Sequence, residues 1–122
     1  MFKISKEDTS EDRMILYLLE IDIEGTKVVK FGITRRKIEE RVAEILTSLF
    51  YKTRRFHYCY PKRFKTVDNA LDKEAKLLDY FKDYKYEGYK FSGHTELRTV
   101  SLEEAVEAYD CLVKEDKLPE RK

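Results

Sequence analysis

Four side chains in the first two thirds of the 122-residue chain have types that could act together in catalysis: Tyr17, Lys30, Arg41 and Glu74. A phenol and an amine can exchange protons, a guanidinium binds phosphate or carboxylate through several donors, and a carboxylate binds a hard cation. Taken singly, each type also has an ordinary structural use, such as a strand tyrosine that packs on a sheet. Their spacing matters because it decides whether folding brings them together.

A β-hairpin is predicted around the first two of these residues. Two apolar runs rich in β-branched residues, 14–23 and 27–34, flank the pair Glu24 and Gly25. Glycine tolerates the positive φ that a tight hairpin turn needs, so we expect two antiparallel strands joined by a two-residue loop.

The register of this hairpin sets Tyr17 opposite Gly32 and makes Tyr17 and Lys30 diagonal neighbours on one face, roughly 7 to 8 Å apart. A slip of one residue would move them to opposite faces. Gly32 lies on the same face, where its missing side chain leaves room for another backbone or a ligand. All three are candidate site residues, although a lysine can also blunt an exposed sheet edge.

Arg41 falls on an amphipathic helix predicted over 37–50. The apolar side chains of this segment recur at the spacing of one core-facing stripe: Ile38, Val42, Ile45, Leu46 and Leu49. Arg41 lies about 80° from the centre of the stripe, so we expect it at the edge. From there it can reach across the end of the hairpin or pair with a nearby glutamate, the usual fate of a helix arginine. The basic turn before the helix adds Arg35 and Arg36 as candidate substrate contacts.

Glu74 falls on a second helix, predicted over 70–84. Three preceding residues offer side-chain oxygens for its N-cap: Thr66, Asp68 and Asn69. Its apolar face is formed by Ala70, Leu71, Leu77, Leu78 and Phe81. Glu74 lies near the middle of that face, and an ionised carboxylate is costly to bury unless it is paired or binds a metal. We therefore expect a cation beside Glu74, either a metal ion or a lysine or arginine at the rim of the core.

Basic charge is concentrated in one part of the chain. The formal net charge is only +1, yet residues 27–65 contain twelve Lys or Arg against three acids. Residues 52–65 interleave basic and aromatic side chains, with a third strand predicted at about 55–60 and closed by Pro61. Cations contact phosphates and rings stack on bases, so this pattern is typical of a nucleic-acid surface. Ordinary sheet packing and a solvated, charged surface are the alternatives.

The rest of the chain completes a fold of the α+β class, a small antiparallel sheet of about three strands flanked by helices. Residues 86–100 are turn-rich with brief strands, and His94 and Glu96 are candidates there by type alone. Ser101 opens a third helix, to about residue 114, with a capping box.

Length and composition predict one domain at 14–114, between a loose arm at 1–13 and a frayed tail at 115–122. No apolar run approaches the roughly 18 residues of a membrane span, so we expect a soluble, cytoplasmic protein with no membrane partner. Cys59 and Cys111 lack the spacing of a zinc site, which favours free thiols over a disulfide.

In order and type, these residues resemble the motifs of the GIY-YIG nuclease superfamily, particularly its compact phage-type and restriction-type branches. Residues 15–17, Ile-Leu-Tyr, stand where the family has Gly-Ile-Tyr, and residues 30–32, Lys-Phe-Gly, stand where it has Tyr-Ile-Gly. Arg41 follows the glycine by nine residues, and Glu74 stands on the later helix at the place of the metal-binding glutamate. The resemblance covers about residues 14–91 and implies a GIY-YIG-like sandwich of sheet and helices.

The chain departs from the family pattern at three places. The first motif lacks its glycine, and Lys30 replaces the usual second-motif tyrosine, as in some restriction-type members. Ile45 stands where some members have a histidine, one helical turn after the arginine. His57 and Tyr17 are the candidates to replace that histidine.

The resemblance implies a metal-dependent endonuclease that hydrolyses phosphodiester bonds in nucleic acid, with DNA expected in preference to RNA. It assigns Mg²⁺ or Mn²⁺ to Glu74, activation of the attacking water to Lys30 or Tyr17, and neutralisation of transition-state charge to Arg41. Candidate substrate contacts are Gly32, Arg35, Arg36, His57 and His94.

The expected assembly is a monomer or a homodimer, because one active site cuts one strand at a time. A non-catalytic nucleic-acid-binding module with the same fold is the main alternative, and a small domain that binds a protein partner is another. A binding module has no need for a carboxylate at the phosphate site.

Overall fold

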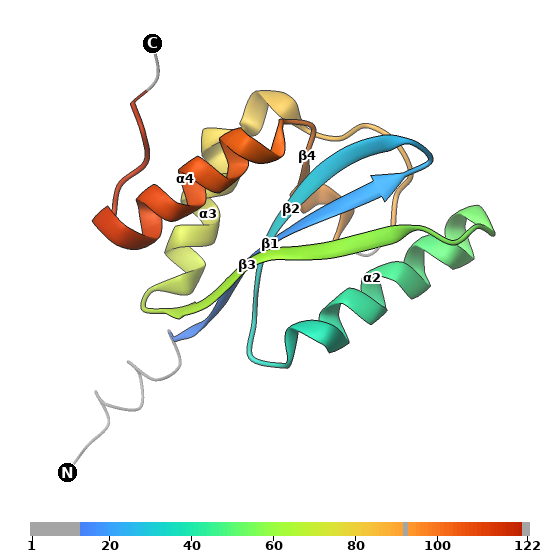
Figure 1. Cartoon of the computed structure of the whole chain (residues 1–122), viewed down its shortest axis with the longest axis horizontal. Helices are drawn as coiled ribbons and strands as arrows, with labels where there is room; N and C mark the ends of the chain where they lie inside the picture. The colour runs from blue at the N-terminus through green and yellow to red at the C-terminus, as the bar shows by residue number, and fades with distance from the viewer. Residues whose placement is uncertain (1–12, 92, 121–122) are drawn as a thin grey trace.

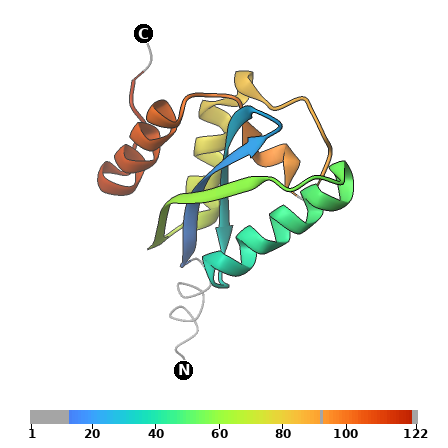
Figure 2. The same ribbon diagram turned by 45° about the vertical axis from the view of Figure 1, so that its right-hand side comes forward.

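The computed structural model describes residues 13–91 and 93–120, so the predicted arm lies outside this range except for its last residue. The chain forms an antiparallel sheet with α-helices on both faces (Figures 1 and 2). The elements in chain order are β1 (Met14–Ile23), β2 (Thr26–Thr34), α2 (Ile38–Thr53), β3 (Tyr58–Val67), α3 (Ala70–Tyr80), the 3-10 turns η1 (Lys82–Tyr84) and η2 (His94–Glu96), β4 (Leu97–Arg98) and α4 (Leu102–Glu115). The strand order is β3-β1-β2-β4, which confirms the α+β class with four strands rather than three.

The sheet has a separate apolar core on each face. Helix α2 covers one face, and α3 and α4 cover the other (Figure 1). Leu16 and Leu18 of β1 pack with α3 and α4, whereas Leu19 and Ile21 pack with α2. Side chains alternate along a strand, so the apolar run of β1 requires helices on both sides.

The β1–β2 hairpin has the predicted register. Tyr17 pairs with Gly32. The two loop residues, Glu24 and Gly25, have φ values of 54° and 91°. Two successive positive φ values give a turn whose twist matches that of the flanking strands, which fixes the pairing of the whole hairpin.

Strand β3 differs from the prediction. It runs over Tyr58–Val67 rather than 55–60, and Pro61 lies inside it instead of closing it. The strand forms an edge of the sheet, and its register with β1 shifts between Leu18 and Leu19, next to the proline. An edge position and a bulge are the two places where a strand accommodates a residue without an N–H.

Helices α2 and α3 begin close to where they were predicted but end elsewhere, whereas α4 ends at Glu115, close to the predicted residue 114. Helix α2 continues to Thr53, beyond residue 50, and α3 stops at Tyr80. Asn69, the N-cap residue of α3, has a left-handed conformation and no side-chain capping hydrogen bond, so the predicted cap is wrong there.

Strand β4 lies within residues 86–100, the turn-rich segment in which brief strands were predicted. It pairs with Val29 and Lys30 of β2, and its Arg98 also forms an isolated antiparallel bridge with Lys85. Within residues 13–91 and 93–120, the remainder of that edge of β2 therefore has no strand beside it.

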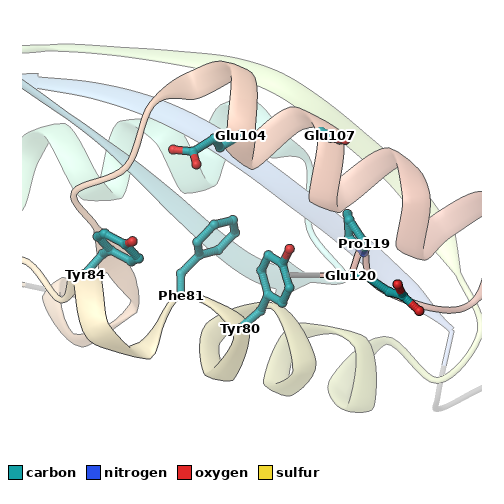
Figure 3. Close-up of a pocket in the computed structure, with 7 residues that line it drawn as sticks. All are labelled: Tyr80, Phe81, Tyr84, Glu104, Glu107, Pro119 and Glu120. Carbon is teal, nitrogen blue, oxygen red and sulfur yellow. The ribbon is translucent and has the colours of Figure 1, made fainter. Parts of the chain in front are cut away.

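The start of α4 agrees with the predicted capping box, since the Glu104 amide donates to the Ser101 hydroxyl at 3.1 Å. In the predicted tail, Leu118 is partly buried and packs against the core formed by α3 and α4. Figure 3 shows how the tail, α3, η1 and α4 enclose a pocket of about 330 Å³. Its lining residues are Tyr80, Phe81, Tyr84, Glu104, Glu107, Pro119 and Glu120.

Both cysteines are free thiols, as predicted. Cys59 is buried, and burial raises the pKa of its thiol to about 12 despite the opposing charge of Lys30. None of the helices within the described ranges is long and apolar enough to cross a membrane.

Candidate functional site

Lys30 is at the centre of the candidate site. Its side chain is fully buried, with 0% exposure, in the middle of β2. The ammonium lies 5.5 Å from the centroid of the Tyr17 ring, as expected for diagonal neighbours on one face, and forms an ion pair with Glu96. A lysine is rarely buried completely unless it is paired, so this part of the sheet is arranged around one cation.

Gly32 makes room for the Tyr17 ring. A Cβ at position 32 would overlap with the hydroxyl and ring carbons of Tyr17. The space that the sequence left open for a backbone or a ligand is therefore filled by the phenol itself, and this glycine determines where the Tyr17 hydroxyl lies.

Arg41 makes both of the contacts considered for it. Its Nε donates to the Tyr17 hydroxyl at 3.1 Å, and its Nη1 donates to Glu44 at 2.9 Å. Burial lowers the pKa of Arg41, but the contacts with Tyr17 and Glu44 outweigh it and raise the pKa overall. The edge of the α2 stripe thus brings a guanidinium to the end of the hairpin, as predicted.

Glu44 holds a second arginine as well. Arg36 contacts its carboxylate at 2.7 and 2.8 Å. Hydrogen bonds from Arg36 and Arg41 lower the pKa of Glu44 to about 2. Arg36 and Arg41 thus bind one anionic group, the exposed carboxylate of Glu44. Paired guanidinium donors bind a phosphate in the same way.

Glu74 is buried on α3, with 8% exposure. Burial, the charge of Glu96 and a hydrogen bond with Glu96 together raise the pKa of its carboxyl to about 7, and the charge of Lys30 opposes them. The cation that we expected beside Glu74 is Lys30. The carboxylate of Glu96 lies between Lys30 and Glu74.

The loop before β4 supplies a site residue that the sequence identified only by type. Glu96 ends η2 and pairs with Lys30 across 66 positions of the chain. Gly93 precedes η2 with φ +82°, and a Cβ there would lie 2.9 Å from Lys30 Cε and 3.2 Å from Arg41 Nη2. The loop at Gly93 therefore covers Lys30 and Arg41. In the sequence, the glycine in the turn-rich segment was the one sign of this close contact.

The four predicted residues come from both layers of the fold. Arg41 belongs to α2 on one face of the sheet, and Glu74 belongs to α3 on the other. Strand β4 pairs with Val29 and Lys30, and Glu96, the residue directly before it, forms an ion pair with Lys30. The short fourth strand is therefore part of what assembles the site.

Phe64 of β3 borders the same face. It pairs directly with Tyr17 across the β1–β3 ladder, and directly opposed residues project to the same side. Its ring is 55% exposed. An exposed ring next to a buried polar cluster is a natural stacking surface for a base.

The remaining candidates lie outside this cluster. His57 lines a pocket at the hairpin turn with Gly25, and its ring nitrogens are shielded from solvent with no hydrogen-bond partner among the described residues. His94 Nδ1 lies 2.8 Å from the Phe91 carbonyl oxygen, which orients its ring within the loop. Arg35 is exposed in the turn between β2 and α2.

The carboxylate oxygens of the site are suited to a hard cation such as Mg²⁺. No group of three or more His, Cys, Asp or Glu side chains gathers in residues 13–91 and 93–120. Mg²⁺ needs no such group, because it keeps several waters and binds through one or two carboxylates and the oxygens of a substrate. The buried oxygens of Glu74 fit that description.

Comparison with known protein families extends over most of the chain. Residues 14–113 match the model of the T5orf172 domain. The chain belongs to the T5orf172 domain family. This family is associated with phage-type and GIY-YIG-like nuclease folds, and it indicates a nucleic-acid-related function. Neither a curated protein nor a solved structure matches the chain.

Proposed function

We propose that this T5orf172 domain is a metal-dependent endonuclease of the GIY-YIG type, which hydrolyses phosphodiester bonds in DNA. The observation that carries the proposal is the convergence of Tyr17, Lys30, Arg41 and Glu74 from four different elements on one buried point. A buried ion pair such as Lys30–Glu96 is often no more stabilising than packed apolar residues in its place, so stability of the core alone does not account for it. Such an enzyme would act in the cytoplasm, as a monomer or a homodimer.

Lys30 and Tyr17 are suited to handle the attacking water. The Tyr17 hydroxyl accepts a hydrogen bond from Arg41 and keeps its own proton available to donate. Lys30 is held beside the ring and away from solvent. Groups fixed in this way orient a nucleophile and move its proton without reorganising.

Arg41 is suited to bind the scissile phosphate. Its Nε is engaged by Tyr17 and its Nη1 by Glu44, which fixes the plane of the guanidinium. A fixed fork of donors stabilises charge that develops on phosphate oxygens in the transition state. In this proposal Glu74 holds the divalent ion. Bound Mg²⁺ or Mn²⁺ would polarise the phosphate and stabilise the leaving oxygen.

The test is incubation of the purified protein with supercoiled plasmid and Mg²⁺ or Mn²⁺. The proposal expects nicked or linear product that is absent with EDTA and absent with Glu74→Ala. Glu107→Gln, an exposed acid on α4, is the matched control and should cut like the unmodified protein. Full activity of Glu74→Ala would refute the assignment.

A non-catalytic nucleic-acid-binding module is the second candidate. It is favoured by Glu44, which neutralises both Arg36 and Arg41, and by the missing glycine of the first motif. This alternative expects a salt-sensitive gel shift with DNA that Glu74→Ala leaves intact, and no strand cleavage under any metal condition.

A further inference from the structure

Glu96 stands where two oppositely charged groups of the site meet. It forms an ion pair with the buried ammonium of Lys30 and a hydrogen bond with the carboxyl of Glu74. It comes from η2, just before β4, outside the segment that carries the nuclease-like motifs. The fold therefore adds a second carboxylate to the place where Glu74 alone was expected.

Two carboxyl groups face one ammonium, and like carboxylates in a buried site disfavour each other's ionisation. The hydrogen bond between Glu74 and Glu96 therefore needs a proton on one of the two. Glu74 has 8% exposure, so little water can separate the charges. A divalent cation between the two groups would take the place of that proton and bind both as carboxylates.

We propose that Glu96 is the second carboxylate ligand of the divalent ion, and that Lys30 takes the place of the ion against Glu96 when no metal is bound. The inference rests on the proposed function of Glu74 as a metal ligand. Two carboxylates, waters and substrate oxygens form the set that Mg²⁺ prefers. Metal binding then frees Lys30 from its ion pair, so the group that handles the water becomes available only when the metal is present.

Binding of Mn²⁺ to the protein without nucleic acid tests this proposal, because it needs no cleavage. Free Mn²⁺ is counted by electron paramagnetic resonance at a series of metal concentrations. We expect both Glu96→Gln and Glu74→Gln to weaken binding by about tenfold to a hundredfold. Lys30→Met removes the competing cation and should tighten binding several-fold. Glu107→Gln serves as the control, and circular dichroism verifies the fold of each variant.

The outcomes separate this inference from the proposed function. Weak binding by Glu74→Gln with unchanged binding by Glu96→Gln would overturn the role of Glu96 and leave Glu74 as the ligand. Weaker binding by a folded Lys30→Met would overturn the exchange between Lys30 and the metal. Plasmid cleavage that persists in EDTA would overturn the metal-dependent function itself.

Discussion

The ammonium of Lys30 lies 5.5 Å from the centroid of the Tyr17 ring, and the two side chains have exposures of 0% and 1%. A cation–π contact of this kind gains strength when water is excluded. Burial of a charge nevertheless costs several kcal/mol, which an ion pair offsets only in part. The hairpin thus holds the ammonium of Lys30 in a position where its burial costs free energy. This favours a catalytic role for Lys30 over a structural one.

The first prediction concerns Lys30→Met. Methionine fills a similar volume without a charge but leaves the carboxylate of Glu96 without its partner, so we expect the variant to fold with a lower free energy of unfolding than the unmodified protein. Its single-turnover cleavage rate should fall by about 10²- to 10⁴-fold, because the water loses its proton-handling group. A variant that unfolds while the active fraction keeps its rate would show that Lys30 is structural.

The second prediction concerns the anion held by the two arginines. Glu44→Gln keeps the size of the side chain but removes the carboxylate that contacts Arg36 and Arg41. We expect a tighter complex with DNA and a steeper dependence of affinity on salt, measured by fluorescence anisotropy, because two cations become available to phosphates. Unchanged affinity at every salt concentration would mean that these arginines do not contact the backbone.

Phe64 gives a prediction about substrate binding. The ring is exposed beside Tyr17, so Phe64→Ala should raise KM and leave kcat nearly unchanged. Stacking on one base contributes about 1 to 3 kcal/mol, or roughly a 5- to 150-fold change. Tyr51→Ala, an exposed ring on α2, is the control. A fall in kcat with constant KM would contradict a stacking role.

Glu74 should make the stability of the metal-free protein depend on pH. Its pKa is about 7 in the folded protein and 4.5 as the ordinary value, so the folded state holds a proton that the unfolded chain releases. This stabilisation is complete below pH 4.5 and is lost as pH rises through about 7, at a cost of about 3 kcal/mol.

Urea denaturation in EDTA at pH 5 and pH 8 measures this effect. Relative to Glu74→Gln, the unmodified protein should lose free energy of unfolding between the two values. A constant difference between the two proteins would show that Glu74 titrates normally.

The local parts of the site could be predicted from the sequence. The register of the hairpin follows from its two-residue turn, which placed Tyr17 beside Lys30. Helical periodicity placed Arg41 at the edge of its stripe and Glu74 on a buried face. Each of these depends on neighbours within one hairpin or one helix.

The parts that depend on distant contacts could not be predicted. Glu96 meets Lys30 across 66 positions, and no periodicity encodes that contact. Local sequence predicts that Pro61 ends its strand, whereas it lies inside β3. The edge position and the bulge that accommodate it are properties of the whole sheet, so the local sequence does not show them. His57 was a candidate by type, but the later start of β3 leaves it at the hairpin turn.

The central claim is that the cluster around Lys30 cuts nucleic acid with the help of Glu74. The most direct measurement is the initial rate of nicking of supercoiled plasmid in Mg²⁺ by the unmodified protein, Glu74→Gln and Glu107→Gln. We expect equal rates for the unmodified protein and Glu107→Gln, and a rate about 10²- to 10⁴-fold lower for Glu74→Gln. Equal rates for all three proteins, or nicking that continues in EDTA, would contradict it.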